Sequence, residues 1–226
     1  VGRLLSWVLR PEVTLSNLNL FAITLNTVVI SFFSSILIVI LAFLIVFSKN
    51  YFNNGPLKKI SQVATLGYSI PGAIIAIGIL KLSSAMENFT SLLLIGSISG
   101  LVFSYIVRFL AVAWQPIDSS MGKLSTNINM ALRTLNVKPV KSLLNVNYGV
   151  LKKPIFIACL IVFIDISKEL PITLILRPFN FDTLSTLTYD LVNQAQFYQS
   201  SIPSLIIISI SLPAILLIKN QMDKGT

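Results

Sequence analysis

The chain contains no histidine, and only one of its 226 residues is a cysteine, Cys159. Without histidine it lacks the commonest metal ligand and the usual proton shuttle near neutral pH. A single cysteine excludes an intramolecular disulfide. No other ligand residues are clustered at metal-binding spacing. We therefore expect no metal site and no cofactor bound by this chain.

Charged residues are also scarce. They make up 11% of the chain, against about 25% in a typical soluble domain, whereas hydrophobic residues make up 54%. This composition predicts an all-α, polytopic membrane protein. The net charge of +9 does not indicate nucleic-acid binding, because the basic residues fall between apolar runs and not on one soluble face. The sequence also has no Gly-rich phosphate loop, so we expect a transport subunit and not an enzyme.

Long apolar runs predict about five to six transmembrane helices. The clear runs are 20–47, 60–82, 89–114, 154–176 and 202–218. Residues 20–218 are thus expected to form one transmembrane domain. Residues 1–19 precede it as a connecting or interfacial segment, and 219–226 follow it as a cytoplasmic tail.

The basic residues predict the orientation of these runs. Most of the lysines and arginines lie in 48–59, 115–153 and 219–226, whereas 83–88 and 177–200 hold only Arg177. Because basic loops stay inside, we expect the first three segments, and with them the C-terminus, to be cytoplasmic. The longest of these segments, about 115–153, reads as two short helices around a turn and leaves room for docking a partner.

The fourth run is interrupted by charge. Asp165, Lys168 and Glu169 lie in it, directly before Pro171. A charge at membrane depth costs roughly 2.5–3.5 kcal/mol on insertion scales and usually faces protein or water, and proline breaks a helix. If the helix continues, the three charged residues share one face. This mixed cluster suits a gate better than a tight cation site. Two alternatives are an ion pair between Lys168 and Glu169 that fixes the bend, and a position at the membrane interface.

Two further features lie in the second and third runs. Pro71 and Gly72 predict a helix kink, which could serve packing alone. Arg108 lies toward the end of the third run, where we expect its side chain to extend to the interface.

The stretch 168–184 reads KELPITLILRPFNFDTL and follows Phe163 and Asp165. It resembles the signature region of the permease subunits of bacterial ferric-iron ABC importers, in the superfamily of binding-protein-dependent, type I ABC permeases. The stretches IPGAIIAIG at 70–78 and YIVRF at 105–109 are similar to the corresponding permease helices. The resemblance runs from about Leu20 to the C-terminus and matches the second half of a two-half permease, so the sequence could be a piece of a longer chain.

This resemblance implies a permease subunit of an ATP-driven importer for ferric iron in the bacterial inner membrane. The implied partners are cytoplasmic ATPase subunits that bind the ATP, an extracytoplasmic substrate-binding protein and a second permease half. The residues assigned to the pathway or gate are Asp165, Lys168, Glu169, Pro171, Arg177 and Asp182.

The resemblance also places an ATPase-coupling loop in the long cytoplasmic segment. Its residues here are Met130, Ala131, Arg133, Leu135, Asn136 and Gly149. The family pattern has a glutamate where this chain has Met130, and a glycine where it has Asn136. Asparagine is the best non-glycine residue for a left-handed turn position, so the second change is mild.

Three alternatives stay open on the sequence alone. The chain could be an ABC permease for another small solute, such as a phosphonate or a polyamine, because selectivity in such importers lies largely in the binding protein. It could be a gradient-driven carrier or channel that uses the charges at 165–169. It could also be a non-transporting assembly subunit.

Overall fold

The computed structural model describes residues 1–9, 19–52, 66–87, 96–122 and 148–223. These residues form helices joined by turns, with no strand among them, which confirms the all-α prediction. Three helices in this part of the chain are long and apolar enough to cross a membrane. The chain is therefore an all-helical membrane protein, and the count of five to six crossings stays a prediction.

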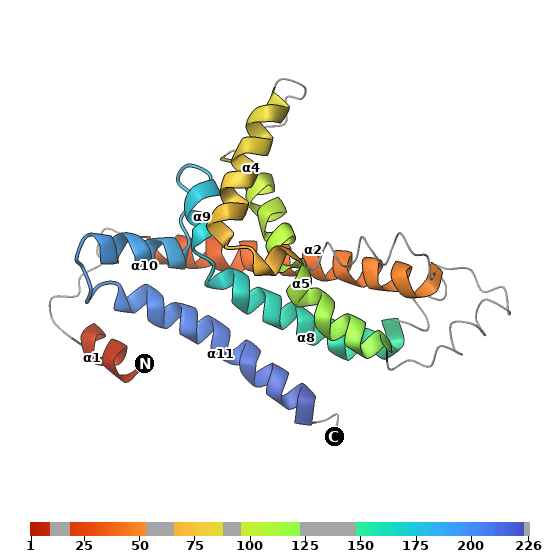
Figure 1. The fold of residues 1–226 in the computed structure, drawn as a ribbon. Coiled ribbons are helices and arrows are strands. Elements are labelled where there is room, and N and C mark those ends of the chain that lie inside the picture. Colours follow the sequence, from red (N-terminus) through yellow and green to blue (C-terminus); the bar gives the residue numbers. More distant parts are fainter. Residues whose placement is uncertain (10–18, 53–65, 88–95, 123–147, 224–226) are drawn as a thin grey trace.

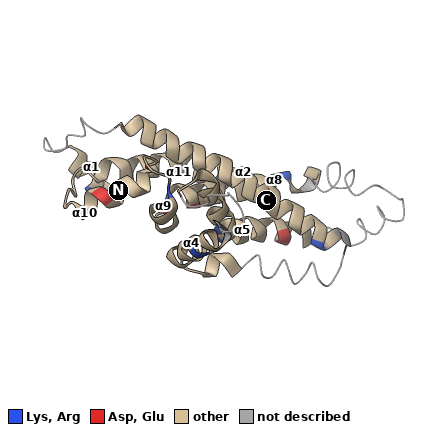
Figure 2. Ribbon diagram, turned by 90° about the horizontal axis from the view of Figure 1, so that it is seen from above, with Lys and Arg blue, Asp and Glu red and all other residues tan. Residues whose placement is uncertain are grey.

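Four long helices make up the body of the molecule. They are α2 (Leu20–Phe52), α5 (Ile98–Gly122), α8 (Tyr148–Ser167) and α11 (Ser201–Asp223). The lengths of α2, α8 and α11 run in roughly the same direction in Figure 1, and α4 (Gly72–Glu87) projects away from them beside the upper part of α5. Most of the described ribbon carries no charge (Figure 2).

The core lies where α2, α5 and α8 pack together. Its fully buried apolar residues include Ile38, Ala42, Val46, Leu101, Ile117, Leu151, Ala158 and Val162. Small polar residues on α2 (Thr27, Ser31, Ser34 and Ser35) are buried as well. Small side chains let membrane helices approach closely, whereas the exposed side of α2 carries large apolar residues such as Phe21 and Phe33 that suit lipid.

The helices beside the long polar segment extend further than the apolar runs indicated. α5 passes through Pro116 to Gly122, and α8 begins at Tyr148, before Pro154. The end of α5 is tied to the end of α2, because Nζ of Lys49 lies 2.9 Å from both carboxylate oxygens of Asp118. Residues 123–147, which hold most of the predicted coupling loop, lie outside the described part of the chain.

The semi-polar segment 177–200 contains a helix of its own. This is α10 (Leu184–Asn193), which Thr183 caps through a reciprocal pair of hydrogen bonds with Thr186. α10 packs against the start of α2 through a small apolar cluster around Ile23 and Leu187. The backbone N–H of Leu184 donates to Oγ1 of Thr27 at 2.9 Å, so α10 is fixed to α2.

The first helix, α1 (Gly2–Val8), has no buried residue. It contacts the turn before α11, where the rings of Trp7 and Tyr198 meet edge to face with centroids 5.7 Å apart. Tryptophan and tyrosine are typical of the membrane–water boundary. The connecting or interfacial role expected for residues 1–19 stays a prediction.

Candidate functional site

The site is built around a break between two helices. α8 ends at Ser167, and α9 (Pro171–Leu176) begins after three non-helical residues, Lys168 to Leu170. Pro171 occupies the start of α9, where its missing N–H costs nothing. A side-chain oxygen of Glu169 accepts a hydrogen bond from the backbone N–H of Ile172 at 3.3 Å. The interruption that Pro171 predicted therefore exists, and Glu169 stabilises the start of the new helix.

Two ion pairs flank the break, and neither is the one considered from the sequence. Nζ of Lys168 lies 2.9 Å from Asp165, whereas the carboxylate of Glu169 lies 3.6 Å from Nε of Arg108 on α5. A pair between Lys168 and Glu169 that fixes the bend before Pro171 was one of the alternatives. Because α8 ends before Lys168, the Glu169 side chain turns toward α5 instead, and the expected pairing is wrong.

Arg108 is the residue that sequence reasoning missed. Its side chain is only 20% exposed, and that of Glu169 is 7% exposed, so the pair is largely buried. The expected extension of Arg108 to the interface is therefore wrong. Its Nε and Nη1 atoms are buried without a hydrogen-bond partner within the described residues, which makes the pair a loose one. The sequence did contain a signal for this pair. Arg108 and Glu169 carry opposite charges, each lies in an apolar run, and a charge in such a run needs a partner.

Two glycines, one in the turn before α4 and one at the start of α4, allow close approach to α5 and to this ion pair. A Cβ on Gly72 would lie 1.9 Å from Nη1 of Arg108 and 2.9 Å from Oε1 of Glu169. A Cβ on Gly67, in the short turn Leu66–Ser69, would lie 1.8 Å from the carbonyl oxygen of Val107. α4 begins at Gly72, directly after Pro71. Residues 66–87 therefore contain a helix boundary where the sequence predicted a kink inside one span.

A buried hydrogen-bond chain joins α5 to α9 behind the pair. Oγ1 of Thr173 donates to the carbonyl oxygen of Glu169 at 2.9 Å, so the hydroxyl of Tyr105 donates to that Oγ1 at 2.6 Å. Oγ of Ser185 donates to the same carbonyl at 2.9 Å. The break is thus held from α5, from α9 and from α10, while its charged side chains face a cavity.

That cavity has a volume of about 290 Å³. It is lined by Tyr68, Arg108, Phe109, Asp165, Lys168, Glu169, Leu170 and Pro171. Lys168 is 59% exposed, and its ammonium group is paired with Asp165. We call this the break cavity. Its charges are two cations, each beside a carboxylate, so it can exchange ion-pair partners but offers a metal ion no uncommitted set of oxygens. Among the described residues, no group of three or more His, Cys, Asp or Glu side chains could hold a metal ion.

Arg177 and Asp182, assigned to the same pathway, do not line the break cavity. Arg177 pairs with Asp182 and lies 3.5 Å from Asp190 on α10. Arg177 and Asp182 line a second cavity of about 480 Å³, together with Pro178 and Phe179. The predicted pathway residues therefore form two separate clusters.

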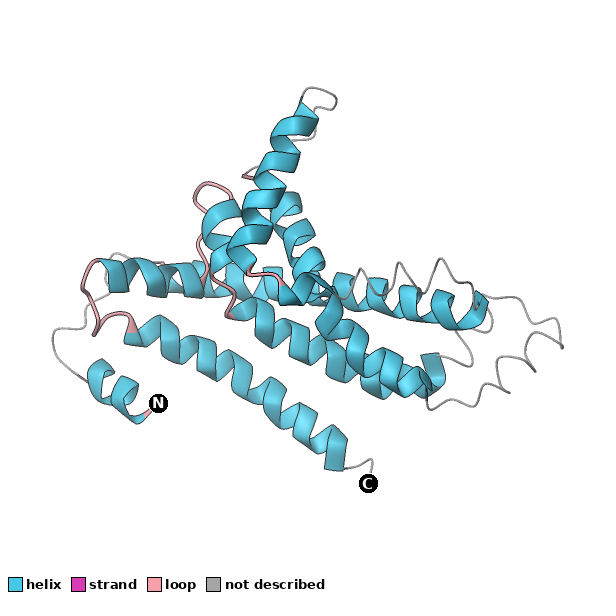
Figure 3. Ribbon diagram, in the orientation of Figure 1, coloured by secondary structure: helices cyan, strands magenta, loops and turns pink. Residues whose placement is uncertain are grey.

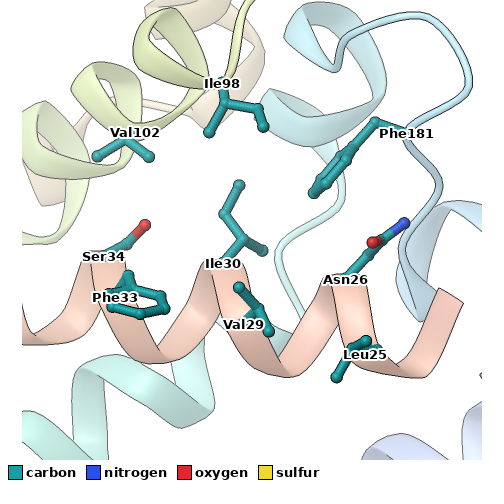
Figure 4. A pocket seen from close by; sticks show the side chains of 9 residues that line it. All are labelled: Leu25, Asn26, Val29, Ile30, Phe33, Ser34, Ile98, Val102 and Phe181. Atoms are coloured by element: carbon teal, nitrogen blue, oxygen red, sulfur yellow. The ribbon is translucent and has the colours of Figure 1, made fainter. Parts of the chain in front are cut away.

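A third cavity, of about 400 Å³, is apolar (Figure 4). It lies between α2 and the start of α5, and Phe181 closes one end. Its polar members are Asn26 and Ser34, and the buried Oγ of Ser34 has no hydrogen-bond partner among the described residues. This lining suits hydrocarbon, so we do not place a charged cargo here.

The coupling-loop assignments are mostly beyond the described residues. Met130, Ala131, Arg133, Leu135 and Asn136 lie outside them. Gly149 lies in the first turn of α8 and is exposed. This position does not test the coupling role of Gly149, which stays a prediction.

Comparison with known proteins identifies the fold. No protein-family model matches the chain, and no curated protein sequence does. A solved structure does match: a chain in the crystal structure of a bacterial alginate ABC transporter in complex with an alginate pentasaccharide-bound periplasmic protein. The two chains superpose with a TM-score of 0.68 over 93% of this chain and 81% of the other, at 13% sequence identity. The fold is thus one that occurs in an ABC transporter complex.

Gly72→Ala tests the contact at the ion pair. The added methyl group requires the Arg108 guanidinium to shift. Because this group is the end of a flexible side chain, we expect a stability loss of about 1 kcal/mol, the lower end of the range for overpacking, together with a loss of transport. Gly78→Ala is the matched control on the same helix, because its Cβ meets nothing within 4 Å and alanine favours helix. Thermal unfolding in detergent and uptake in vesicles measure the two effects. Equal behaviour of the two variants would contradict the contact.

Proposed function

We propose that the chain is a transmembrane permease subunit of an ATP-driven, binding-protein-dependent importer. The observation that carries the proposal is the break cavity, a charged cavity beside an interrupted helix in a fold that also occurs in an ABC transporter complex. Interrupted helices with buried charges are typical of transport pathways. The proposed import needs an energy source, and no ATP-binding loop is visible in the sequence, so a separate ATPase is expected to bind and hydrolyse the ATP.

In this proposal the break cavity acts as a gate. The pair of Arg108 with Glu169 and the pair of Lys168 with Asp165 hold α5 and the α8–α9 break in one arrangement. A change of state requires an element with two arrangements whose energies differ little. The Arg108–Glu169 pair leaves N–H groups of Arg108 without a partner among the described residues. It therefore meets this requirement better than a fully hydrogen-bonded pair, because less interaction free energy is lost when it opens.

Ferric iron is the proposed cargo, on the resemblance of residues 168–184 to ferric-iron permeases. Fe³⁺ prefers several hard oxygen ligands, and the break cavity offers two carboxylates that already have cationic partners. The chain is therefore proposed to conduct the cargo without storing it at a stable site. Selection is assigned to an extracytoplasmic binding protein.

The remaining parts of the assembly follow from the charge pattern. The basic segments 48–59, 115–153 and 219–226 are placed in the cytoplasm, and the loop within 115–153 is proposed to dock the ATPase. A second permease half completes the pathway across the bilayer of the bacterial inner membrane. Deleting residues 128–138 should then abolish association with the ATPase, which co-purification measures.

Uptake in vesicles tests the proposal. The full permease is reconstituted with its ATPase and binding protein, and radioactive ferric iron is supplied with either partner omitted in turn. We expect uptake only when both partners and ATP are present. Uptake without ATP that follows the membrane potential would show a carrier or channel instead. ATP hydrolysis stimulated by the binding protein without iron uptake would keep the permease and reject the cargo, with a phosphonate or a polyamine as the next candidates.

A further inference from the structure

The loop between α9 and α10 presents an aromatic ring to solvent. Phe179 is 94% exposed, the highest fraction among the large apolar side chains of the described residues. It lies in the Arg177–Thr183 loop, which protrudes beside α9 in Figure 3. An apolar ring of this size costs free energy when it stays in water, so its full exposure needs an explanation.

This loop is fixed at several points. Arg177 pairs with Asp182 across the loop and lies 3.5 Å from Asp190 on α10. The carbonyl oxygen of Asp182 accepts a hydrogen bond from Nδ2 of Asn26 on α2 at 3.2 Å. A turn closes the tip, because the N–H of Phe181 donates to the carbonyl oxygen of Pro178 at 3.1 Å. The exposed ring is therefore held on a rigid support.

The backbone at the tip adds to this fixed geometry. Asn180 has φ of 58°, in the left-handed region that asparagine tolerates better than most residues. Pro178 restricts the chain on the other side of the ring. A ring whose backbone is already ordered loses little conformational entropy when a partner covers it, and aromatic side chains of this kind dominate binding energy at interfaces.

Charge around the ring indicates the kind of partner. The side chains of Asp182 and Asp190 are 45% and 40% exposed, while Arg177 is only 23% exposed between them. The exposed charge beside Phe179 is thus negative. An acidic rim disfavours an anionic lipid surface and favours a protein surface with an apolar recess bordered by lysine or arginine. The proposed orientation puts the basic segments in the cytoplasm. It therefore puts this loop on the opposite, extracytoplasmic side of the membrane.

We infer that Phe179 and its acidic rim are a docking element for the extracytoplasmic binding protein, which receives the ring in an apolar recess bordered by basic residues. This inference rests on the proposed function, because it needs an importer with such a partner. It reassigns Arg177 and Asp182 from the pathway to the support of the docking loop, in agreement with their absence from the break cavity.

The test uses the complete permease in lipid nanodiscs and the binding protein of the uptake assay. Binding is measured by surface plasmon resonance for the wild type, for Phe179→Ala and for Phe197→Ala. Phe197 is the control, since it is a 51% exposed aromatic residue in the turn between α10 and α11. We expect Phe179→Ala to weaken binding at least about tenfold and Phe197→Ala to leave it within about twofold. We also expect the wild-type affinity to fall as salt is raised.

A fluorescent variant distinguishes the binding protein from other occupants. Trp7 and Trp114 are replaced by phenylalanine, and Phe179→Trp then reports on its surroundings. We expect emission typical of water for the permease alone and a blue shift when the binding protein is added. A blue shift already present in the nanodisc overturns the inference, because lipid or the second permease half then covers the ring. Unchanged affinity of Phe179→Ala also overturns it, whereas a wild type that binds no binding protein rejects the proposed function itself.

Discussion

Gly67→Ala is expected to cost about 3 kcal/mol of stability, the upper end of the usual range for overpacking. The added methyl group would lie 1.8 Å from the carbonyl oxygen of Val107 and 2.9 Å from its carbonyl carbon. Both atoms belong to the backbone of α5, which cannot move locally as a side chain can. The substitution must therefore separate the Leu66–Ser69 turn from α5, and with it displace Tyr68 from the break cavity.

Thermal unfolding of the purified protein in detergent measures this effect. Gly78→Ala is again the control, because it adds the same methyl group on α4 where nothing lies within 4 Å. We expect the melting temperature of Gly78→Ala to equal or slightly exceed that of the wild type, and that of Gly67→Ala to fall by several degrees. A melting temperature of Gly67→Ala within one degree of the control would contradict the close approach of the turn to α5.

The second large effect concerns the buried ion pair. Glu169→Gln or Arg108→Gln leaves one buried charge without its partner, and breaking such a pair typically costs about 3–5 kcal/mol. Replacing both residues by apolar ones, as Arg108→Met with Glu169→Leu, removes both charges and should restore much of the stability. We expect this double variant to fold and to reach the membrane but to transport no cargo, because the proposed gate has lost its charges.

Lys168→Gln is the control for the pair. Lys168 is 59% exposed and its partner Asp165 is 14% exposed, whereas Arg108 and Glu169 are both largely buried. The loss of Lys168 should therefore cost less stability than the loss of either member of the Arg108–Glu169 pair. Expression, unfolding in detergent and ATP-dependent uptake separate folding from transport. A double variant as unstable as either single variant would disprove the compensation, and one that transports normally would disprove the gate.

The sequence predicted the helix break better than it predicted the contacts around it. Charges and a proline inside an apolar run were enough to locate the break, because each of them is costly in an unbroken membrane helix. The choice of partner was not predictable in the same way. It depended on α8 ending at Ser167, directly before Lys168 and Glu169, and helix ends are the least certain part of any sequence-based interpretation.

Contacts between segments far apart in the sequence could not be predicted for a further reason. Gly67 gave no signal of its own, because its importance comes from the Val107 carbonyl on another helix. Arg108 was assigned to the interface, since a long side chain near the end of an apolar run usually reaches water. Its partner Glu169 lies on a different element, and only the packing of α5 against the α8–α9 break brings the two together.

Accessibility of the break cavity during turnover tests the central claim most directly. Cys159 is the only cysteine, so a Cys159→Ala background allows Lys168→Cys to be labelled with a membrane-impermeant cationic thiol reagent, with Phe33→Cys on the exposed face of α2 as control. If the break lines a gated pathway, labelling of Lys168→Cys should change sides between the ATP-free complex and the complex trapped with ATP. Labelling at the same rate from the same side in both states would contradict that account.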